Sequence, residues 1–262
     1  MLSIATWNVN SIKSRLQHLT DWLRSDNAPD IVLLQEIKVV NENFPAMEIE
    51  ELGYNIAVHG QKTYNGVAIL SKHPIDDVVT TLPGEPEDEQ ARYIEAVISL
   101  DGGAVRVASI YVPNGQAVDS DKFQYKMRFF DRLYAHAQTL LAHEEKLVWG
   151  GDYNVGPYPE DVYDTKKLDG TVCYHADERA KFRALTHLGL YDAWRLKNPS
   201  TQQFSWWDYR GGSYAQNRGL RIDHLLLSPQ AVDVLSECVI DESLRQLEKP
   251  SDHTPVICTL DA

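Results

Sequence analysis

The decapeptide Lys146-Leu147-Val148-Trp149-Gly150-Gly151-Asp152-Tyr153-Asn154-Val155 decides our interpretation of this 262-residue sequence. Its short apolar run predicts a buried strand. We expect the two glycines that follow to let the backbone turn sharply, so that Asp152 and Asn154 emerge together at the strand's end. In open α/β sheets, ligands bind beyond the strand ends, and a carboxylate beside an amide suits metals, water and phosphate oxygens. Asp and Asn are also ordinary turn residues, so the rest of the chain must decide between a turn and a site.

Composition predicts a single domain over residues 1–262. The chain is 43% hydrophobic and 10% aromatic, which is enough for a sizeable core, and no Pro-, Gly- or Ser-rich linker divides it. No apolar run approaches the ~20 residues that cross a bilayer, and residues 1–7 lack the features of a secretory signal. Cys173, Cys238 and Cys258 lack metal-ligand spacing, so we expect free, mostly buried thiols. The sequence therefore predicts a cytoplasmic protein without a membrane partner.

The net charge of −13 argues at first against a nucleic-acid partner, because phosphate binding needs a positive surface. Part of the acidic excess lies in segments 42–51 and 85–89, which we interpret as solvated loop or helix faces. If other acids surround a divalent cation, the electrostatic field that a substrate meets differs from the one that the formal net charge suggests. The net charge alone therefore does not exclude a nucleic acid.

A helix followed by a strand that leads to an acid occurs twice. Apolar residues at helical spacing predict a helix over 12–23, and the apolar strand 31–34 after it leads to Glu36. A second helix over 123–141 has one apolar face, and the strand after it leads to Asp152. We therefore expect two similar halves that face one cleft.

Polar side chains recur at the ends of the predicted strands. Apart from those named above, we expect strands at 2–7, 54–58, 66–70, 93–100, 105–112, 225–227 and 256–260. The polar residues at strand ends are Asn8, Glu36, Tyr111, Asp152, Asn154, Asp223, Asp252 and His253. Each one alone is more often structural, but together they could hold a hard cation, activate water and bind a phosphate oxygen. The sequence has no cysteine cluster of the kind that binds zinc, whereas oxygen-rich ligands suit Mg²⁺, with Mn²⁺ as an alternative. A site of this kind has what phosphodiester hydrolysis requires.

Six segments in this order resemble the motifs of the endonuclease/exonuclease/phosphatase superfamily. They are Trp7-Asn8-Val9-Asn10, Gln35-Glu36, Tyr111-Val112-Pro113-Asn114-Gly115, Gly151-Asp152-Tyr153-Asn154, residues 217–223 and Ser251-Asp252-His253. The chain resembles in particular the bacterial exonuclease III type of apurinic/apyrimidinic (AP) endonuclease, over nearly its whole length. The resemblance implies a four-layered α/β sandwich, in which two mixed β-sheets pack face to face with helices outside. It also implies a Mg²⁺-dependent active site at one edge.

The resemblance implies a metal site and a role for each matching side chain. Glu36 matches the main metal-binding glutamate, with Asn8, Asn10 and Asp252 near the cation. Asn10 stands where some relatives carry Asp. Asp152 matches the residue that orients or deprotonates the attacking water.

The resemblance also implies contacts to the scissile phosphate. His253 would bind the phosphate, held in orientation by Asp223, so that developing charge meets fixed donors. Tyr111 and Asn114 would contact the same phosphate, and Asn154 would support the water-activating acid. Whether the phenol, the carboxylate or a metal-bound hydroxide acts first stays open.

Substrate choice depends on a second set of residues. Adjacent Trp206 and Trp207 must point to opposite faces of a strand, so one can be core while the other faces a ligand. Trp206, Leu220 and Ile222 match positions that line an abasic-sugar pocket, and all three could instead be core. Candidate contacts to the DNA backbone are Arg92, Lys122, Lys126, Arg210, Arg218 and Arg221.

We therefore expect a monomeric AP endonuclease of DNA base-excision repair, located in the cytoplasm at the nucleoid. It would cut duplex DNA on the 5′ side of abasic sites to leave a 3′-hydroxyl. The same site would process blocked 3′ ends through 3′-phosphatase and 3′→5′ exonuclease activities. Two alternatives are a phosphoesterase of the same superfamily that acts on a small-molecule or lipid phosphoester, and a catalytically silent nucleic-acid-binding relative.

Overall fold

Two six-stranded β-sheets form the centre of the molecule in the computed structural model, which describes residues 1–261. The first sheet has the order β11-β12-β1-β2-β4-β3 and the second has the order β5-β6-β7-β8-β10-β9. The strands of the first sheet are β1 (Leu2–Asn8), β2 (Ile31–Gln35), β3 (Asn55–His59), β4 (Val67–Ser71), β11 (Leu235–Ile240) and β12 (Val256–Leu260). Those of the second are β5 (Ile75–Val79), β6 (Tyr93–Leu100), β7 (Gly103–Tyr111), β8 (Leu147–Asp152), β9 (Tyr191–Asp192) and β10 (Asp223–Leu227).

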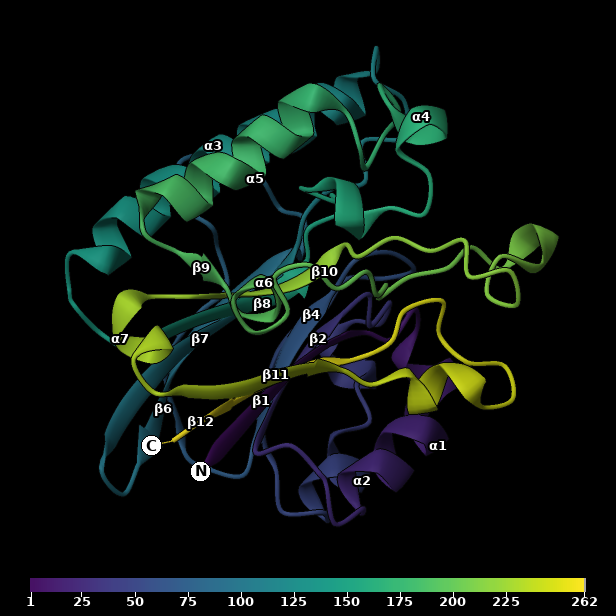
Figure 1. The fold of residues 1–262 in the computed structure, drawn as a ribbon. Coiled ribbons are helices and arrows are strands. Elements are labelled where there is room, and N and C mark those ends of the chain that lie inside the picture. The colour runs from purple at the N-terminus through teal and green to yellow at the C-terminus, as the bar shows by residue number, and fades with distance from the viewer. Residues whose placement is uncertain (262) are drawn as a thin grey trace.

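Helices cover the outer face of each sheet (Figure 1). Helices α1 (Ile12–Leu23) and α2 (Ala46–Glu50) lie outside the first sheet, and α3 (Asp121–Leu141) and α5 (Ala176–Leu188) lie side by side outside the second. The short helices are α4 (Thr165–Leu168), α6 (Ala193–Lys197) and α7 (Pro229–Val232), and the 3₁₀ turns are Asn41–Asn43, Pro159–Asp161, Arg210–Gly212 and Glu242–Gln246. Each sheet mixes parallel and antiparallel pairs. The predicted four-layered α/β sandwich is therefore confirmed.

Apolar side chains fill all three interfaces between these layers, because successive residues of a strand point to opposite faces. Within β1, Ile4 points into the interface between the sheets, while Ala5 and Trp7 pack against the α1 side. Other side chains between the sheets include Leu33, Val107, Val148 and Leu225. Phe130, Leu133, Trp149 and Phe182 join the second sheet to α3 and α5. Both faces of the central strands are thus buried, which explains their continuous apolar runs.

The two predicted helix–strand units are confirmed, and they occupy equivalent places in the two sheets. β1 and β2 are parallel and joined by α1, and β7 and β8 are parallel and joined by α3. β1 also packs against β8 across the interface between the sheets. The carboxyl ends of all four strands therefore meet at one edge, which carries Asn8, Glu36, Tyr111 and Asp152.

The turn that we expected at Gly150 and Gly151 is wrong, because both glycines lie within β8 and Asp152 is its last residue. A Cβ atom at Gly150 would lie 2.6 Å from Leu33 Cδ1 between the sheets. A Cβ atom at Gly151 would lie 2.0 Å from the carbonyl oxygen of Ile110 on β7. These glycines therefore permit close packing of the strand rather than a change of direction.

Strands β5, β9 and β11 were not among the expected strands, and all three are edge strands. β5 is largely exposed and β11 is exposed at half of its positions. Edge strands often carry polar residues in place of a clear apolar pattern, which explains why the sequence did not reveal them.

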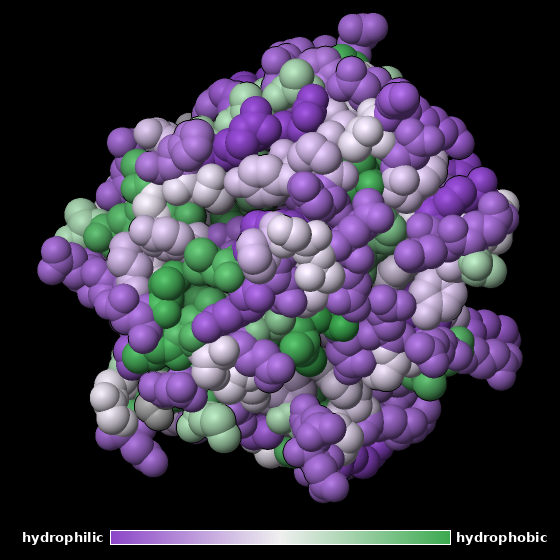
Figure 2. Space-filling view, in the orientation of Figure 1, coloured by the Kyte–Doolittle hydropathy of each residue, from purple (hydrophilic) through white to green (hydrophobic). Residues whose placement is uncertain are grey.

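The visible surface in Figure 2 is mostly hydrophilic, with an apolar patch left of centre in the region of α6, α7 and β11. Within residues 1–261, no helix has the length and apolar character to cross a membrane. Cys173, Cys238 and Cys258 are free and buried, as expected.

Alanine substitutions test the packing role of the two β8 glycines. We expect Gly150→Ala to lower the free energy of unfolding by about 1–3 kcal/mol, because the added methyl group overpacks the interface. Gly151→Ala should cost more, because its neighbour is a backbone carbonyl that cannot rotate away. Gly102→Ala is the control, since its Cβ would meet nothing within 4 Å. Urea denaturation measures all three, and equal stability of the Gly151 and Gly102 variants would contradict this account.

Candidate active site

A pocket of about 260 Å³ opens at the edge where the parallel strands of both sheets end. Its lining residues are Glu36, Tyr111, Asn114, Asp152, Asn154, Cys173, Trp206, Leu220, Ile222, Asp252 and His253. Ten of these eleven were predicted from the sequence, and only Cys173 was not. We call this cavity the catalytic pocket.

Asn8, at the end of β1, joins the acids of the two sheets. Its fully buried amide Nδ2 donates to Glu36 Oε1 at 2.8 Å and to Asp152 Oδ2 at 3.0 Å. Its Oδ1 accepts from the backbone N–H of Asn10 at 3.0 Å. Asn8 therefore lies behind the pocket and fixes the two carboxylates relative to each other.

Glu36 follows β2 with a positive φ of 51° and carries an ionised carboxylate. Burial alone would raise its pKa, but the ammonium group of Lys38 and the hydrogen bond from Asn8 lower the pKa below its ordinary value. Lys38 Nζ lies 2.8 Å from Glu36 Oε2 and also donates to the amide oxygen of Asn10. Lys38 was not among the predicted site residues, although its charge two residues after the acid was a visible signal.

Asp152, Asp223 and His253 form a buried chain of ionisable groups. His253 Nδ1 lies 2.9 Å from Asp223 Oδ2, and its Nε2 lies 3.8 Å from Asp152 Oδ2. Burial lowers the pKa of His253, but the two carboxylates raise it to about 10 overall. Burial raises the pKa of Asp152 to about 7, opposed by His253 and reinforced by Asp223 and Glu36. The pair thus holds a charged imidazole beside a carboxylate that can take up a proton.

Ser205 fixes Asp223, which is fully buried and lies opposite Asp152 in the β8–β10 register. Its hydroxyl donates to Asp223 Oδ2 at 2.6 Å and accepts from the backbone N–H groups of Ile222 and Asp223 at 3.1 Å. Sequence reasoning missed this serine, because a serine beside two tryptophans carries no signal for a partner 18 positions away.

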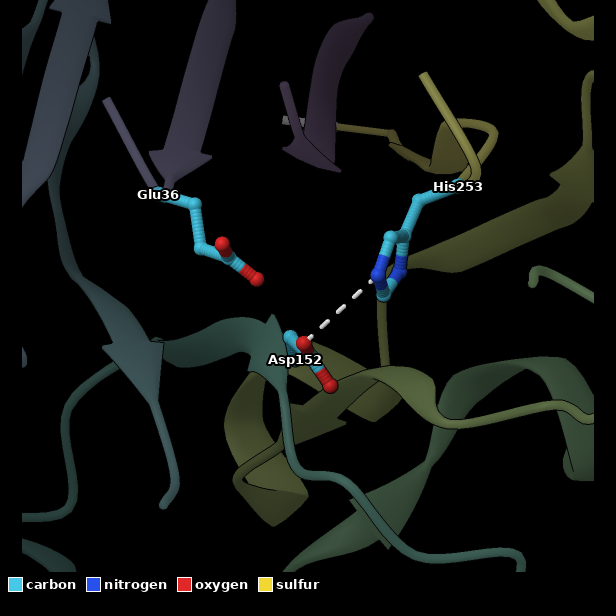
Figure 3. A group of neighbouring side chains, drawn as sticks. All are labelled: Glu36, Asp152 and His253. Atoms are coloured by element: carbon cyan, nitrogen blue, oxygen red, sulfur yellow. Dashed lines mark ion pairs between the residues drawn. The ribbon is translucent and has the colours of Figure 1, made fainter. Parts of the chain in front are cut away.

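Glu36, Asp152 and His253 point toward one another from three different segments (Figure 3). One ligand atom from each lies within 4.8 Å of the other two. The amide oxygen of Asn10 and the carboxylate of Glu36 already hold one cation, the Lys38 ammonium. Carboxylate and amide oxygens are hard donors, so the residues present fit Mg²⁺ or Mn²⁺.

Asp252 lines the pocket and is held there by Asn10 and Trp206. Asn10 Nδ2 donates to Asp252 Oδ1 at 2.8 Å, and Trp206 Nε1 donates to Asp252 Oδ2 at 3.0 Å. Burial would raise the pKa of Asp252, but His253 and these donors lower it. The carboxylate is therefore ionised and joins the predicted metal site to the tryptophan.

Asn154 and Asn114 form a second amide pair. Asn114 Nδ2 donates to Asn154 Oδ1 at 2.9 Å, and the backbone N–H of Asn154 donates to Asp152 Oδ1 at 2.9 Å. Tyr111 lies opposite Asp152 in the β7–β8 register. Burial raises the pKa of its phenol well above the ordinary value, and Glu36 and Asp152 raise it further. Tyr111 is therefore a neutral hydrogen-bond donor here.

One of the two tryptophans is core and the other faces the pocket, as predicted, although neither lies within a named strand. Trp207 is fully buried, whereas Trp206 is half-buried and lines the pocket. Leu220 and Ile222 are 6% and 3% exposed, so they belong to a small apolar cluster and line the pocket as well. Leu220 and Ile222 are therefore core residues that also form part of the pocket wall, so both of the roles that we considered apply.

Two of the six candidate cations for DNA contacts were wrong, because Lys126 and Arg221 are fully buried. Arg221 lies between two carboxylates: its Nε is 2.7 Å from Asp161 Oδ1, and its Nη2 is 2.8 Å from Asp192 Oδ2. Arg218 is half-buried and lines a neighbouring cavity instead of the catalytic pocket. Lys122, Arg210 and Arg92 are exposed or partly exposed, and the Arg92 guanidinium lies 4.6 Å from the Tyr111 ring.

Lys126, on α3, holds the two loops that carry the amide pair. Its ammonium contacts Glu178 of α5 and donates to the backbone carbonyl groups of Asn154 at 2.7 Å and Asn114 at 3.2 Å. Both side chains of the ion pair are 0% exposed. An unpaired buried charge is costly, so this pair ties the positions of the helices to those of the loops.

The comparisons with known proteins agree with this geometry. The model of the Endonuclease/Exonuclease/phosphatase family matches residues 5–253. The chain is 33% identical to exodeoxyribonuclease III of Haemophilus influenzae, over 97% of this chain and 98% of that protein. A solved structure of the 3′ phosphatase NExo from Neisseria, bound to a product DNA hairpin, is similar with a TM-score of 0.96 and 40% identity over 100% of both chains. An AP endonuclease from Archaeoglobus fulgidus is similar with a TM-score of 0.94 and 39% identity over 100% of both chains.

A sandwich whose sheet edge gathers acids, amides and a histidine has the architecture of a metal-dependent phosphoester hydrolase. The chain belongs to the Endonuclease/Exonuclease/phosphatase family, and it is a nuclease. The resemblance to AP endonucleases of the exonuclease III type is therefore confirmed.

Substitutions at Lys126 and Glu178 separate stability from positioning. Lys126→Met should lower the free energy of unfolding by about 3–5 kcal/mol, because it leaves the Glu178 carboxylate buried and unpaired. The double variant Lys126→Met/Glu178→Leu should recover most of that stability. The nuclease activity of the double variant should stay at least tenfold below that of the wild type, because the carbonyl groups of Asn114 and Asn154 have lost the Lys126 ammonium as their shared donor. Lys197→Met, at an exposed position of α6, is the control, and full activity in the double variant would contradict a positioning role.

Proposed function

We propose that this chain is a Mg²⁺-dependent AP endonuclease that cuts duplex DNA 5′ to abasic sites and leaves a 3′-hydroxyl. We also propose 3′→5′ exonuclease and 3′-phosphatase activities at the same site. The observation that carries the proposal is that Asp152 and His253 share one small pocket with the apolar side chains of Trp206, Leu220 and Ile222. Relatives named as an exodeoxyribonuclease, a 3′ phosphatase bound to DNA and an AP endonuclease support it.

In this proposal His253 binds the scissile phosphate. Its Nδ1–H is committed to Asp223, and its Nε2 lies 3.8 Å from Asp152, which is beyond hydrogen-bond distance. The Nε2–H group is therefore free to donate to a phosphate oxygen. Because the pKa of His253 is raised, the imidazole stays charged at neutral pH and stabilises charge that develops on the phosphate.

Asp152 is the proposed base. It accepts a proton from water as the water oxygen forms a bond to phosphorus. The bond from phosphorus to the 3′ oxygen of the preceding nucleotide breaks, and that oxygen takes a proton from solvent to become the 3′-hydroxyl. A pKa of about 7 suits this task, since the carboxylate is then matched to neutral pH. Asn154 orients the carboxylate through its backbone N–H, and Tyr111 and Asn114 donate to the phosphate.

We propose that Glu36 is the main metal ligand and that Asn8, Asn10 and Asp252 complete or support the site. Bound Mg²⁺, or Mn²⁺ in its place, would neutralise phosphate charge and lower the pKa of bound water. Lys38, whose ammonium lies 2.8 Å from the Glu36 carboxylate, would compete with the metal for that carboxylate.

The apolar wall of the pocket is the proposed site for the abasic sugar. Trp206, Leu220 and Ile222 are close to His253, and the volume of about 260 Å³ limits what can enter. A deoxyribose without a base fits such a space better than a complete nucleotide. Arg218 would contact the DNA backbone at the neighbouring cavity.

We further propose that residues 1–262 form one domain that acts as a monomer on duplex DNA with abasic sites or blocked 3′ ends. Its expected place is the cytoplasm at the nucleoid. The convergence of Glu36, Asp152 and His253 favours an active enzyme over a catalytically silent relative. The apolar pocket wall favours an abasic sugar over a small-molecule or lipid phosphoester.

Incision of a defined duplex tests the proposed function. With Mg²⁺, the protein should cut a duplex that contains a tetrahydrofuran abasic analogue on its 5′ side, and chelation should abolish the reaction. Asp152→Asn should lower kcat by about 10²–10⁴-fold, because general base catalysis is lost. Asp77→Asn, on the exposed edge strand β5, is the matched control and should be unchanged. Cleavage of p-nitrophenyl phosphodiesters but not of the duplex would overturn the DNA assignment.

A further inference from the structure

A second cavity of about 420 Å³ adjoins the catalytic pocket. The two share Asn114, Cys173, Trp206 and Leu220. The remaining lining residues come from the segment after β8 and from the segment before β10, namely Tyr163, Lys167, Leu168, Val172, Asp208, Ser213 and Arg218. Its volume lies within the range of roughly 300–1,000 Å³ typical of small-ligand sites, whereas the catalytic pocket is smaller.

The lining of this cavity suits a flat, partly apolar group. Tyr163, Leu168, Val172 and Trp206 are partly buried and pack against one apolar cluster, which leaves part of each side chain exposed to the cavity. Aromatic rings at such positions stack on nucleobases whatever the sequence. Lys167 Nζ lies 5.7 Å from the centre of the Tyr163 ring, so an aromatic ring and a cation occur together.

Polar groups of the cavity favour an anionic strand. Arg218 donates through Nη2 to the carbonyl group of Gly211 at 2.6 Å, while its buried Nε has no hydrogen-bond partner within residues 1–261. The carboxylate of Asp208 is neutralised by Arg210 at 2.8 Å. Two cations, Lys167 and Arg218, therefore face this cavity with no unneutralised acid among its lining residues.

The proposed exonuclease activity needs such a space. In the proposed function the catalytic pocket takes only the sugar and the phosphate, whereas a 3′-terminal nucleotide still carries its base. We infer that the second cavity, the base pocket, takes the unpaired base of the 3′-terminal nucleotide while its phosphodiester lies beside His253 and Asp152. This inference rests on the proposed function. A mismatched terminal base enters at the lowest cost, because it has no pairing to lose.

Filling the base pocket tests the inference. Leu168→Trp adds an indole to its wall, and Leu168→Met is the control of similar volume. The substrates are one duplex with a mismatched 3′-terminal nucleotide, the same duplex with a 3′-phosphate, and one with an internal tetrahydrofuran. We expect Leu168→Trp to lower exonucleolytic release at least tenfold, with 3′-phosphate removal and tetrahydrofuran incision within twofold of wild type.

Tyr163 gives an independent variant in case Leu168→Trp fails to fold, as judged by thermal unfolding. Tyr163→Ala should lower exonucleolytic release at least fivefold through a raised KM, because stacking is lost. Tyr163→Phe keeps the ring and should retain wild-type activity. Unchanged exonuclease activity in Tyr163→Ala and Leu168→Trp, or an equal fall of all three activities in either folded variant, would overturn the base pocket. Failure of the wild-type protein on the tetrahydrofuran and 3′-phosphate duplexes would instead overturn the proposed function.

Discussion

One buried amide group holds the site together. Asn8 Nδ2 carries two hydrogens, and it donates one to Glu36 of the first sheet's unit and one to Asp152 of the second's. The Glu36 and Asp152 carboxylates share this one donor and therefore repel each other, which is one reason that the pKa of Asp152 is raised. The backbone carbonyl group of Asn8 also accepts from Ser251 Oγ at 2.7 Å, and the Ser251 hydroxyl accepts from the backbone N–H of His253. The segments that carry Glu36, Asp152 and His253 are therefore all tied to the end of β1.

Buried ion pairs hold the irregular segments around this centre. Lys126 and Glu178 fix the loops after β7 and β8, and Arg221 joins Asp161 of the loop after β8 to Asp192 at the end of β9. Loops lack the regular backbone hydrogen bonds of a sheet, so specific side-chain contacts must define their positions. The pairs carry a desolvation cost, and breaking one leaves an uncompensated buried charge, so both partners are needed to hold the loops. These five charged side chains thus serve the architecture around the pocket and say little about the protein's partners.

The strands and the polar residues at their ends could be predicted from the sequence for a definite physical reason, whereas the four layers and the apolar wall of the pocket were implied by the family resemblance. Strands buried on both faces are continuously apolar, so the polar residue that ends each one, such as Glu36 or Asp152, is conspicuous. The parallel units β1–α1–β2 and β7–α3–β8 then bring those ends to one edge. Lys126 and Arg221 were misjudged because charged residues are rarely buried, and their partners lie 52 and 60 positions away. The glycines of β8 were misjudged because a glycine that permits close packing and one that permits a turn look the same in a sequence.

The central claim is that Glu36, Asp152 and His253 act on one phosphate beside one cation. A crystal structure of the protein with Mn²⁺ and a nicked abasic duplex tests this claim most directly, because anomalous scattering locates the metal without assumptions. The account predicts an anomalous peak within coordination distance of the Glu36 carboxylate, and a phosphate whose oxygen accepts from His253 Nε2 on the side facing Asp152. Mn²⁺ bound only at surface acids, or a phosphate that contacts His253 but lies outside the reach of Asp152 and the metal, would contradict it.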